Sequence, residues 1–443
     1  MSSLAATSKY EKSALLREKA HSLIPGGCHT YAKGDDQFPE DAPGFIARGS
    51  GSHVWDVDGN EFIEYGAGIR CVTLGHAYPS VVAAAHRAML DGCNFTRPAA
   101  IEVEAAEEFL RTITGAEMVK FSKNGSDATT AAVKLARAFT GRDRVAICKD
   151  QPFFSTDDWF IGATTMSAGI PEAVKELTLR FGFNDLASVE ALFSQHPGEI
   201  ACFILEGMNT VEPAEGFLPG LHELCRRNGA LLILDEMITG FRWDNGGAQR
   251  VYGITPDLST FGKAIGNGFA VSALGGRREI MELGGLVQKE RERVFLLSTT
   301  HGGETAGLGA AIETMKIYRR EPVIERLYRQ GERLRAGVRQ AIEASGVGSA
   351  FDVIGRPCGL IYATKDQHGE RSQGFRTLFI QELLKRGILA PNFFVNYSHS
   401  DADIDATVEA VHESLKVYRR ALDEGFEAHL VGRPVQPVLR KFN

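Results

Sequence analysis

Residues 201–237, with the sequence ACFILEGMNTVEPAEGFLPGLHELCRRNGALLILDEM, decide the fold class of this protein. Two runs in this stretch, 201–207 and 230–237, are apolar up to an acidic residue near their end, which is typical of buried parallel strands. The segment between them, 219–229, has apolar residues at helical spacing and ends in Gly229, a common helix stop. The stretch therefore predicts a strand–helix–strand unit of an α/β sheet.

The rest of the chain extends this pattern. Shorter strands are predicted at 118–123, 144–150 and 271–276, with helices between most of them, so we expect a mainly parallel, doubly wound sheet. Nearer the N-terminus, Asp58-Gly59 has the sequence of a hairpin turn. Residues 304–345 are almost entirely helical in period, which predicts a second domain in the C-terminal third.

Size, composition and charge narrow the functional class. The 443 residues, 44% of them hydrophobic and 24% charged, suit an enzyme with a large and a smaller domain. The net charge of −7 argues against nucleic acid or an anionic membrane as a partner. The chain has no apolar run of about 20 residues and no signal-peptide pattern, so we expect a cytoplasmic protein. The seven cysteines are scattered, which predicts free thiols and no metal site.

Asp235 comes directly after the apolar run of the second strand. Open α/β sheets bind their ligands at this carboxyl edge, so we interpret Asp235 as a ligand-binding carboxylate. One alternative is an aspartate that caps the next helix. Another is the magnesium-binding aspartate of P-loop ATPases, but the chain lacks the Gly-x-x-x-x-Gly-Lys-Ser/Thr motif of that class.

Two further elements can reach the same edge. Residues 122–141 join a strand to a helix through Asn124, Gly125 and Ser126, and such a helix start can bind phosphate or simply be capped. Lys263 lies among apolar residues and glycines, where burial lowers the pKa of an amine and lets it form a Schiff base; a surface lysine is the alternative. Pyridoxal 5′-phosphate combines an aldehyde, a phosphate and a ring nitrogen for a carboxylate, so we predict it as the cofactor.

Several motifs along the chain carry a resemblance to a known family. They are IPGG (24–27), VWDVDGNEFIEY (54–65), LGHAYP (74–79), NGSDAT (124–129), GALLILDEMITGFR (229–242) and PDLSTFGKAIGNG (256–268). With these motifs the chain resembles the class III aminotransferases of the fold-type I pyridoxal-phosphate enzymes, and among them the glutamate-1-semialdehyde aminomutase group. The resemblance implies a large cofactor-binding domain at 66–310 and a smaller α+β domain formed by an N-terminal helix and hairpin at 1–65 and by residues 311–443.

The resemblance also assigns roles to individual residues. It implies that Lys263 forms the Schiff base and that Asp235 pairs with the pyridine nitrogen, which makes these two the expected catalytic residues. Met237 would pack on the ring face, where the family usually has valine. The full set of expected cofactor-binding residues is Lys263, Asp235, Asn124, Gly125, Ser126, Phe153, Met237, Thr300 and Glu206.

Some positions depart from the family pattern. The family's aromatic-His-Gly motif, whose aromatic residue stacks on the cofactor ring, aligns with DQPFFSTDDW (150–159). This alignment gives Phe153 for the stack and Phe154 where histidine is usual. Thr300, or Thr299 in an adjacent register, would reach the phosphate in the other subunit of a homodimer.

The expected substrate contacts are Lys33, Tyr31 and Phe154. Lys33 aligns with the arginine that binds the substrate carboxylate in the aminomutases, and a lysine can pair with a carboxylate only as a point charge. The loop after Glu206 is also shorter than theirs. We therefore do not expect glutamate semialdehyde to be the natural substrate.

We predict transamination, in which an amino donor displaces Lys263 and the freed amine moves a proton before a ketone or aldehyde accepts the amino group. One alternative is an aminomutase or racemase, which uses the same lysine and cofactor but retains the amino group. A requirement for a second carbonyl substrate separates the two. Another alternative is a non-catalytic scaffold, which failure to bind the cofactor would favour.

Overall fold

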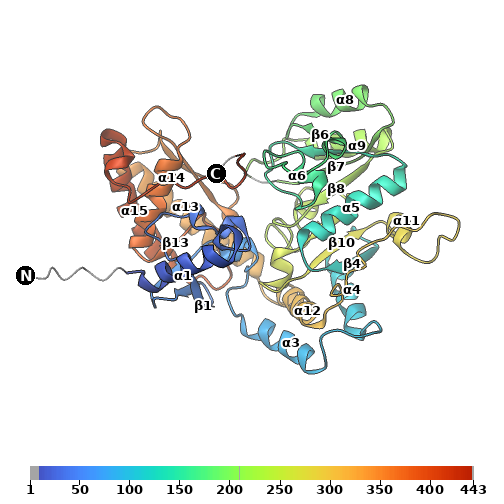
Figure 1. Ribbon diagram of the computed structural model, residues 1–443, viewed down its shortest axis with the longest axis horizontal. Coiled ribbons are helices and arrows are strands. Elements are labelled where there is room, and N and C mark those ends of the chain that lie inside the picture. Colours follow the sequence, from blue (N-terminus) through green and yellow to red (C-terminus); the bar gives the residue numbers. More distant parts are fainter. Residues whose placement is uncertain (1–8, 209, 442–443) are drawn as a thin grey trace, which may run out of the picture. The chain divides into compact units, whose positions relative to one another are not determined.

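The structure is a computed structural model that describes residues 9–208 and 210–441, and the chain divides into two compact units (Figure 1). The smaller unit comprises the chain up to Ile69, Leu74–Tyr78 and Glu325–Val438. The larger unit comprises Arg70–Thr73, Pro79–Ile324 and the chain from Leu439. The domain boundaries predicted after residues 65 and 310 stay predictions.

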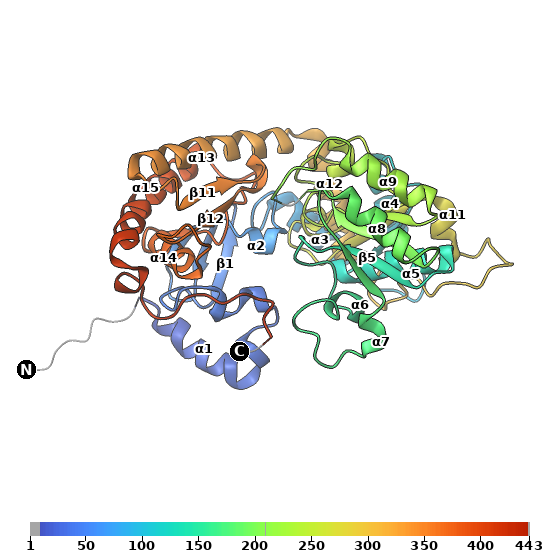
Figure 2. The same ribbon diagram turned by 90° about the horizontal axis from the view of Figure 1, so that it is seen from above.

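A seven-stranded sheet forms the centre of the larger unit (Figure 1 and Figure 2), and the order of its strands is β4-β10-β9-β8-β7-β5-β6. Neighbouring strands are parallel except for β10, which is antiparallel to both β4 and β9. This architecture confirms the predicted α/β class with a mainly parallel sheet. The strands are β4 Met118–Ser122, β5 Arg144–Cys148, β6 Thr178–Phe181, β7 Ile200–Glu206, β8 Leu231–Asp235, β9 Leu258–Phe261 and β10 Ser272–Gly276.

Helices pack against this sheet and against one another. Helix α5 contacts β7, β9 and β10, α9 contacts β8, and α12 packs along α3 and α4. Every residue of β7 and β8 is buried, as their continuous apolar runs predict. The helices are α3 Pro79–Leu90, α4 Ala100–Thr112, α5 Gly125–Thr140, α6 Asp158–Ile161, α7 Glu172–Lys175, α8 Leu186–Gln195, α9 Phe217–Arg227, α10 Ala248–Val251, α11 Arg278–Met281 and α12 Thr305–Arg320, with 3-10 turns at Lys263–Gly266 and Glu282–Gly284. The short helix α2 Ala67–Arg70 spans the boundary, because the first segment of the smaller unit ends at Ile69 and the larger unit begins at Arg70.

Both ends of the chain contribute to the smaller unit. Strands β2 and β3 form the predicted hairpin, with Gly59 at φ 93° in its turn, and β13 from the C-terminal third pairs in parallel with β3. The strands are β1 Ile46–Ser50, β2 His53–Asp56, β3 Glu61–Glu64, β11 Phe351–Ile354, β12 Ile361–Thr364 and β13 Ile388–Leu389. The helices are α1 Glu11–Leu23, α13 Val323–Ser345, α14 Gln373–Lys385 and α15 Asp401–Glu424, with 3-10 turns at Pro25–Gly27, Tyr31–Lys33, Asp35–Gln37, Pro357–Gly359 and Phe426–Ala428.

Across the described residues, each helix is too short or too polar to pass through a bilayer.

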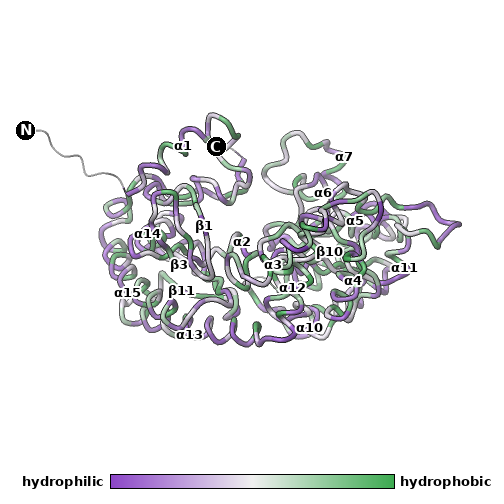
Figure 3. Tube along the Cα trace, turned by 90° about the horizontal axis from the view of Figure 1, so that it is seen from below, coloured by the Kyte–Doolittle hydropathy of each residue, from purple (hydrophilic) through white to green (hydrophobic). Residues whose placement is uncertain are grey.

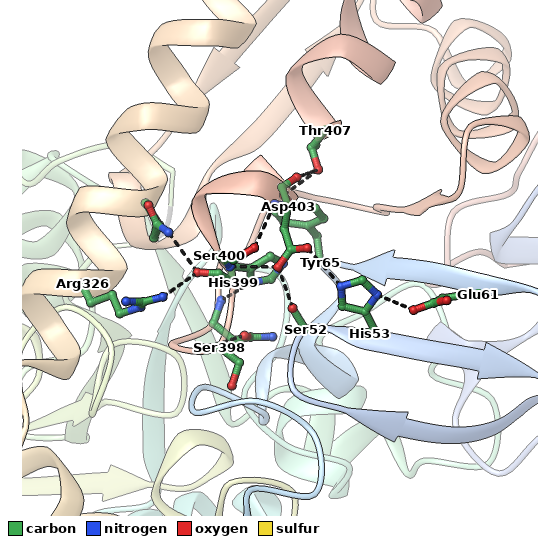
Figure 4. Close-up of polar contacts among 12 residues, drawn as sticks. Ser52, His53, Glu61, Tyr65, Arg326, Ser398, His399, Ser400, Asp403 and Thr407 are labelled. Carbon is green, nitrogen blue, oxygen red and sulfur yellow. Dashed lines mark hydrogen bonds and ion pairs between the residues drawn. The ribbon is translucent and has the colours of Figure 1, made fainter. Parts of the chain in front are cut away.

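A polar network joins the N-terminal hairpin to the start of α15 within the smaller unit (Figure 4). His53 lies between two carboxylates, with Nδ1 2.8 Å from Glu61 Oε1 and Nε2 3.0 Å from Asp403 Oδ1. Asp403 Oδ2 also accepts hydrogen bonds from Ser52 Oγ at 2.9 Å and from the Ser400 N–H at 2.8 Å. The same aspartate therefore caps α15 and holds the hairpin.

His399 is fully buried beside this network. Its Nδ1 accepts a hydrogen bond from the Asn396 N–H at 2.9 Å, and its ring centroid lies 4.4 Å from that of Tyr65. Burial lowers the pKa of His399 to about 4, although the nearby Asp403 opposes the shift. The imidazole is therefore neutral in the folded protein at neutral pH.

This histidine predicts a specific loss of stability in acid. Between about pH 6.5 and pH 4 the unfolded chain binds a proton at His399 that the folded chain does not, so the stability from neutral His399 is lost as pH falls. We expect the advantage of wild type over H399Q in free energy of unfolding to shrink by about 2 kcal/mol from pH 7 to pH 5. Urea unfolding of the two cofactor-free proteins at both pH values measures this difference.

The comparison with H399Q is needed because the pKa shifts of two buried acids change the stability in the opposite direction as the pH falls. Burial raises the pKa of Asp235 to about 6 and that of Glu236 to about 7, so both favour the folded state as pH falls. Both acids are present in wild type and in H399Q, and their contributions cancel in the difference. Parallel pH profiles for the two proteins would show that His399 is not the titrating group.

Candidate functional site

The carboxyl ends of three parallel strands bring the predicted catalytic residues to one edge of the larger sheet. Glu206 at the end of β7 pairs in register with Asp235 at the end of β8, and Asp235 pairs with Thr260 of β9. Lys263 begins the 3-10 turn that follows β9. Glu206, Asp235 and Lys263 therefore meet at the edge where open α/β sheets bind ligands.

Lys263 is partly buried and has an uncommon backbone conformation. Its φ of 46° lies in the left-handed region, which is costly for a residue with a side chain. Desolvation lowers the pKa of its ammonium group, while the carboxylates of Asp235 and Glu206 oppose this shift. A lowered pKa increases the fraction of neutral amine, which is the nucleophilic form.

Asp235 is a buried carboxylate held at one oxygen. Its Oδ1 accepts hydrogen bonds from the Met237 N–H at 2.9 Å and from Thr260 Oγ1 at 3.3 Å. Burial raises its pKa to about 6, although the positive charge of Lys263 opposes the shift. A cation bound at this carboxylate would favour its charged form, and the protonated nitrogen of a pyridine ring is such a cation.

The start of α5 is fixed by side chains of the strand-to-helix turn. Asn124 Oδ1 accepts the N–H of Asp127 at 3.0 Å, and Asp127 Oδ2 accepts the N–H of Asn124 at 3.3 Å, which together form a capping box. The Oγ of Ser126 accepts the N–H of Thr156 at 3.0 Å, so its hydroxyl proton can be donated elsewhere. The positive end of the helix dipole and this hydroxyl suit a phosphate.

Met237 lies between the start of α5 and the turn that carries Lys263. A Cβ atom built on Gly125 would be 2.9 Å from Met237 Sδ, and one built on Gly262 would be 2.6 Å from the same sulfur. The thioether therefore uses the space that both glycines leave open. Together with the donors of α5, Asp235 and Lys263, this cradle fits a flat ring with a phosphate arm.

Replacing Gly125 with alanine is expected to weaken the binding of pyridoxal phosphate about tenfold, because the added methyl group displaces either the helix start or Met237. Titration of the cofactor-free protein, followed by absorbance, measures this affinity. The double variant G125A/M237V removes the sulfur and should recover part of the loss.

Gly141 provides a control at the other end of the same helix. It has a φ of 67°, and a Cβ atom built there would meet nothing within 4 Å. G141A should therefore strain the helix end and leave the affinity for the cofactor unchanged. Equal affinities of G125A and wild type for pyridoxal phosphate would contradict the role of Gly125 and Met237 in binding the cofactor.

The two phenylalanines of the expected stacking motif lie in different environments. Phe153 is 45% exposed and contacts Phe160 edge to face, with the ring centroids 5.5 Å apart. Phe154 is only 2% exposed and belongs to the hydrophobic core, where it packs on the same Phe160. The stacking role of Phe153 and the substrate contact of Phe154 stay predictions, and burial gives Phe154 an evident packing role.

The residues expected to reach a substrate or a second subunit are on surfaces. Thr300 lies in the connection between α11 and α12, which includes a largely hydrophilic loop that extends away from the larger sheet (Figure 3). It is exposed, and its carbonyl accepts a hydrogen bond from Asn94 Nδ2 at 3.1 Å. Tyr31 and Lys33 are exposed in a 3-10 turn of the smaller unit. Their substrate contacts and the cross-subunit role of Thr300 stay predictions.

Two residues of this neighbourhood were missed in the sequence analysis. Thr260 follows Ser259 in β9, and two polar residues in a fully buried strand could have indicated a polar partner such as Asp235. Arg242 is fully buried and donates to the carbonyls of Ile238, at 2.5 Å, and of Arg70. Its sequence context, GFR, gives no sign of this burial.

Comparison with known proteins gives consistent matches over most of the chain. The family model for class-III aminotransferases matches residues 32–415. Glutamate-1-semialdehyde 2,1-aminomutase of Neisseria meningitidis serogroup A is 34% identical over 432 residues, covering 91% of this chain and 99% of that protein.

Two solved structures share the fold. The FumI protein of Sphingopyxis sp. MTA144, in its PLP internal aldimine form, is 28% identical with a TM-score of 0.86, covering 96% of this chain and 98% of that one. An omega-transaminase from Sphaerobacter thermophilus is 28% identical with a TM-score of 0.83, covering 92% of this chain and 98% of that one.

Proposed function

This chain belongs to the class-III aminotransferases, and on that premise we propose that it is an aminotransferase that moves an amino group between an amino donor and a ketone or aldehyde acceptor. Its cofactor is pyridoxal 5′-phosphate, as the family match and the cofactor-bound structural relative indicate. The observation that carries the proposal is the position of Lys263, with its lowered pKa, at the same sheet edge as Asp235.

Each residue of the site would bind a different part of the cofactor. When bound, pyridoxal phosphate supplies an aldehyde that condenses with amines and a ring that accepts electrons from a carbanion. Gly125 and Ser126 would hold the phosphate, Met237 would lie against the ring, and Asp235 would bind the proton on the ring nitrogen. Lys263 would hold the aldehyde carbon.

Lys263 and Asp235 then perform distinct tasks. The Nζ atom of Lys263, as a free amine, would take the proton from the substrate carbon that bears the amino group. Asp235 would provide a negative charge for the ring nitrogen, and its burial would exclude water that screens that charge. Thr260 Oγ1 and the Met237 N–H orient the Asp235 carboxylate for this purpose.

An aminomutase is the second candidate, because the relative that is 34% identical is named glutamate-1-semialdehyde 2,1-aminomutase. The same lysine and cofactor would serve that reaction. Lys33 at the position of the aminomutases' carboxylate-binding arginine supports a different substrate. The likeness to an omega-transaminase supports transfer to a second molecule.

We further propose that the protein acts as a homodimer with shared sites. Apolar side chains are exposed on and after α3 and on α4, with Leu90 73%, Phe95 51% and Val103 62% exposed, and such a surface suits a partner subunit. The exposed Thr300 could then reach the phosphate of the partner's site. The predicted cytoplasmic location stays a prediction.

The visible absorption spectrum of the cofactor-loaded protein, recorded with a panel of amino donors and no acceptor, tests the proposal. Conversion of the bound cofactor to its aminated form, with one carbonyl product per site, would support transamination and identify a donor. A persistent band while an amino compound is isomerised or racemised would support the isomerase alternative. Absence of a band after added cofactor would contradict both.

A further inference from the structure

We propose that Gln151 is a positioning residue for this site, which acts through the main chain of Glu206 and through the loop that carries Phe153. Gln151 lies in the segment DQPFFSTDDW (150–159), but the family resemblance assigns no role to it. The inference rests on the proposed function, because the group that Gln151 helps to position is the cofactor.

Gln151 takes the place of a strand residue beside β7. Its buried carboxamide makes two hydrogen bonds to a single residue: Nε2 donates to the Glu206 carbonyl at 2.7 Å, and Oε1 accepts the Glu206 N–H at 2.8 Å. Strand β5 pairs with β7 only as far as Ile147 and Ile204, and the chain then turns away. The side chain therefore continues the ladder at the position where the backbone of β5 is no longer available.

These two bonds bear directly on the catalytic edge. Glu206 is the register partner of Asp235, and its carboxylate is one of the charges that act on Lys263. A buried backbone N–H or C=O without a hydrogen-bond partner costs free energy. Removing the Gln151 carboxamide would therefore make the Glu206 backbone shift towards new partners or let water enter to bind its N–H and C=O groups. Either response moves the end of β7 relative to the lysine.

The loop after Gln151 is held from its other side by α5. Thr129 Oγ1 donates to the Phe154 carbonyl at 2.8 Å, and the Thr156 N–H donates to Ser126 Oγ at 3.0 Å. Gln151 is the corresponding attachment to the sheet. The loop with Phe153 is thus fixed both to the phosphate-binding helix start and to the strand end beside Lys263.

The test compares two buried glutamines that each make two hydrogen bonds. Q151M keeps the length of the side chain and removes both bonds to Glu206. Q330M is the matched control, because Gln330 is also buried and its Nε2 donates to the His399 carbonyl and to Asp401 Oδ1, both at 2.9 Å, within the smaller unit. For each full-length protein we would measure the melting temperature without cofactor, the Kd for pyridoxal phosphate and the visible absorption maximum of the loaded form.

We expect Q151M to bind pyridoxal phosphate about tenfold more weakly and to shift its absorption maximum, while Q330M lowers the melting temperature and keeps the wild-type Kd and spectrum. Wild-type Kd and spectrum in Q151M would overturn the inference, as would equal losses in both variants. If Q151M does not fold, Q151E replaces it, since glutamate can still accept the Glu206 N–H but cannot donate to the carbonyl. Failure of wild type to bind the cofactor would instead refute the proposed function itself.

Discussion

Replacing Lys263 with alanine is expected to abolish covalent attachment of pyridoxal phosphate and to slow turnover by about 10²–10⁴-fold. Lys263 supplies an amine with a lowered pKa at the sheet edge where Asp235 also lies. The methyl side chain of alanine cannot form a Schiff base with the cofactor or transfer a proton to or from the substrate. Borohydride reduction followed by mass spectrometry measures the attachment and its position. Single-turnover absorbance with an amino donor measures the rate.

Lys120 provides the matched control for this prediction. It lies on β4 of the same sheet, and burial, with a contribution from Arg293, also lowers its pKa. K120A should therefore keep both the covalent label on Lys263 and the wild-type rate. A labelled residue other than Lys263 in wild type, or near-normal turnover in K263A, would contradict the assignment.

Replacing Asp235 with asparagine is expected to slow the first half-reaction by about 10²–10³-fold while the protein remains folded. Asparagine has nearly the same shape but no charge, so it cannot stabilise a protonated ring nitrogen in this buried place. The carbonyl oxygen of the asparagine can still accept the hydrogen bonds from the Met237 N–H and the Thr260 hydroxyl. Stopped-flow absorbance of the loaded protein with an amino donor measures the rate.

Asp257, at the opposite end of the adjoining strand β9, is the control for the loss of a buried carboxylate. Its Oδ2 accepts the Leu232 N–H at 2.8 Å, and its Oδ1 pairs with Arg277 at 2.6 Å. D257N should lower the melting temperature and leave the half-reaction unchanged. Similar rates for D235N and wild type would remove Asp235 from the mechanism.

Several features were predictable from the sequence because short-range physical chemistry determines them. The uninterrupted apolar runs of β7 and β8 predict strands buried on both faces, and those runs alone indicate an α/β sheet. A helix start at Asn124, Gly125 and Ser126 is predicted, and α5 begins at Gly125 with Asn124 as its cap residue. Asp58-Gly59 predicts the hairpin turn, and the motif around Lys263 predicts the family.

Other predictions could not distinguish neighbours that differ in their tertiary environment. Phe153 and Phe154 are adjacent and chemically identical, yet one is nearly half exposed and the other belongs to the core. The strand predicted at 271–276 gives no sign in its sequence that β10 is antiparallel to both of its neighbours. Strand direction depends on where the connecting chain returns to the sheet, which is a property of the whole unit.

The sequence by itself thus determined the class of sheet and the hairpin turn, and it predicted the lysine, the aspartate and the helix start that we propose as the binding site for pyridoxal phosphate. Only the tertiary structure decided that Thr260 binds Asp235, that Arg242 is fully buried and that Gln151 completes the ladder beside Glu206. The physical reason is the range of the interactions: capping and periodicity act within a few residues, whereas Gln151 and Glu206 are 55 positions apart in the chain. Contacts of that kind form only when strands distant in sequence are brought side by side.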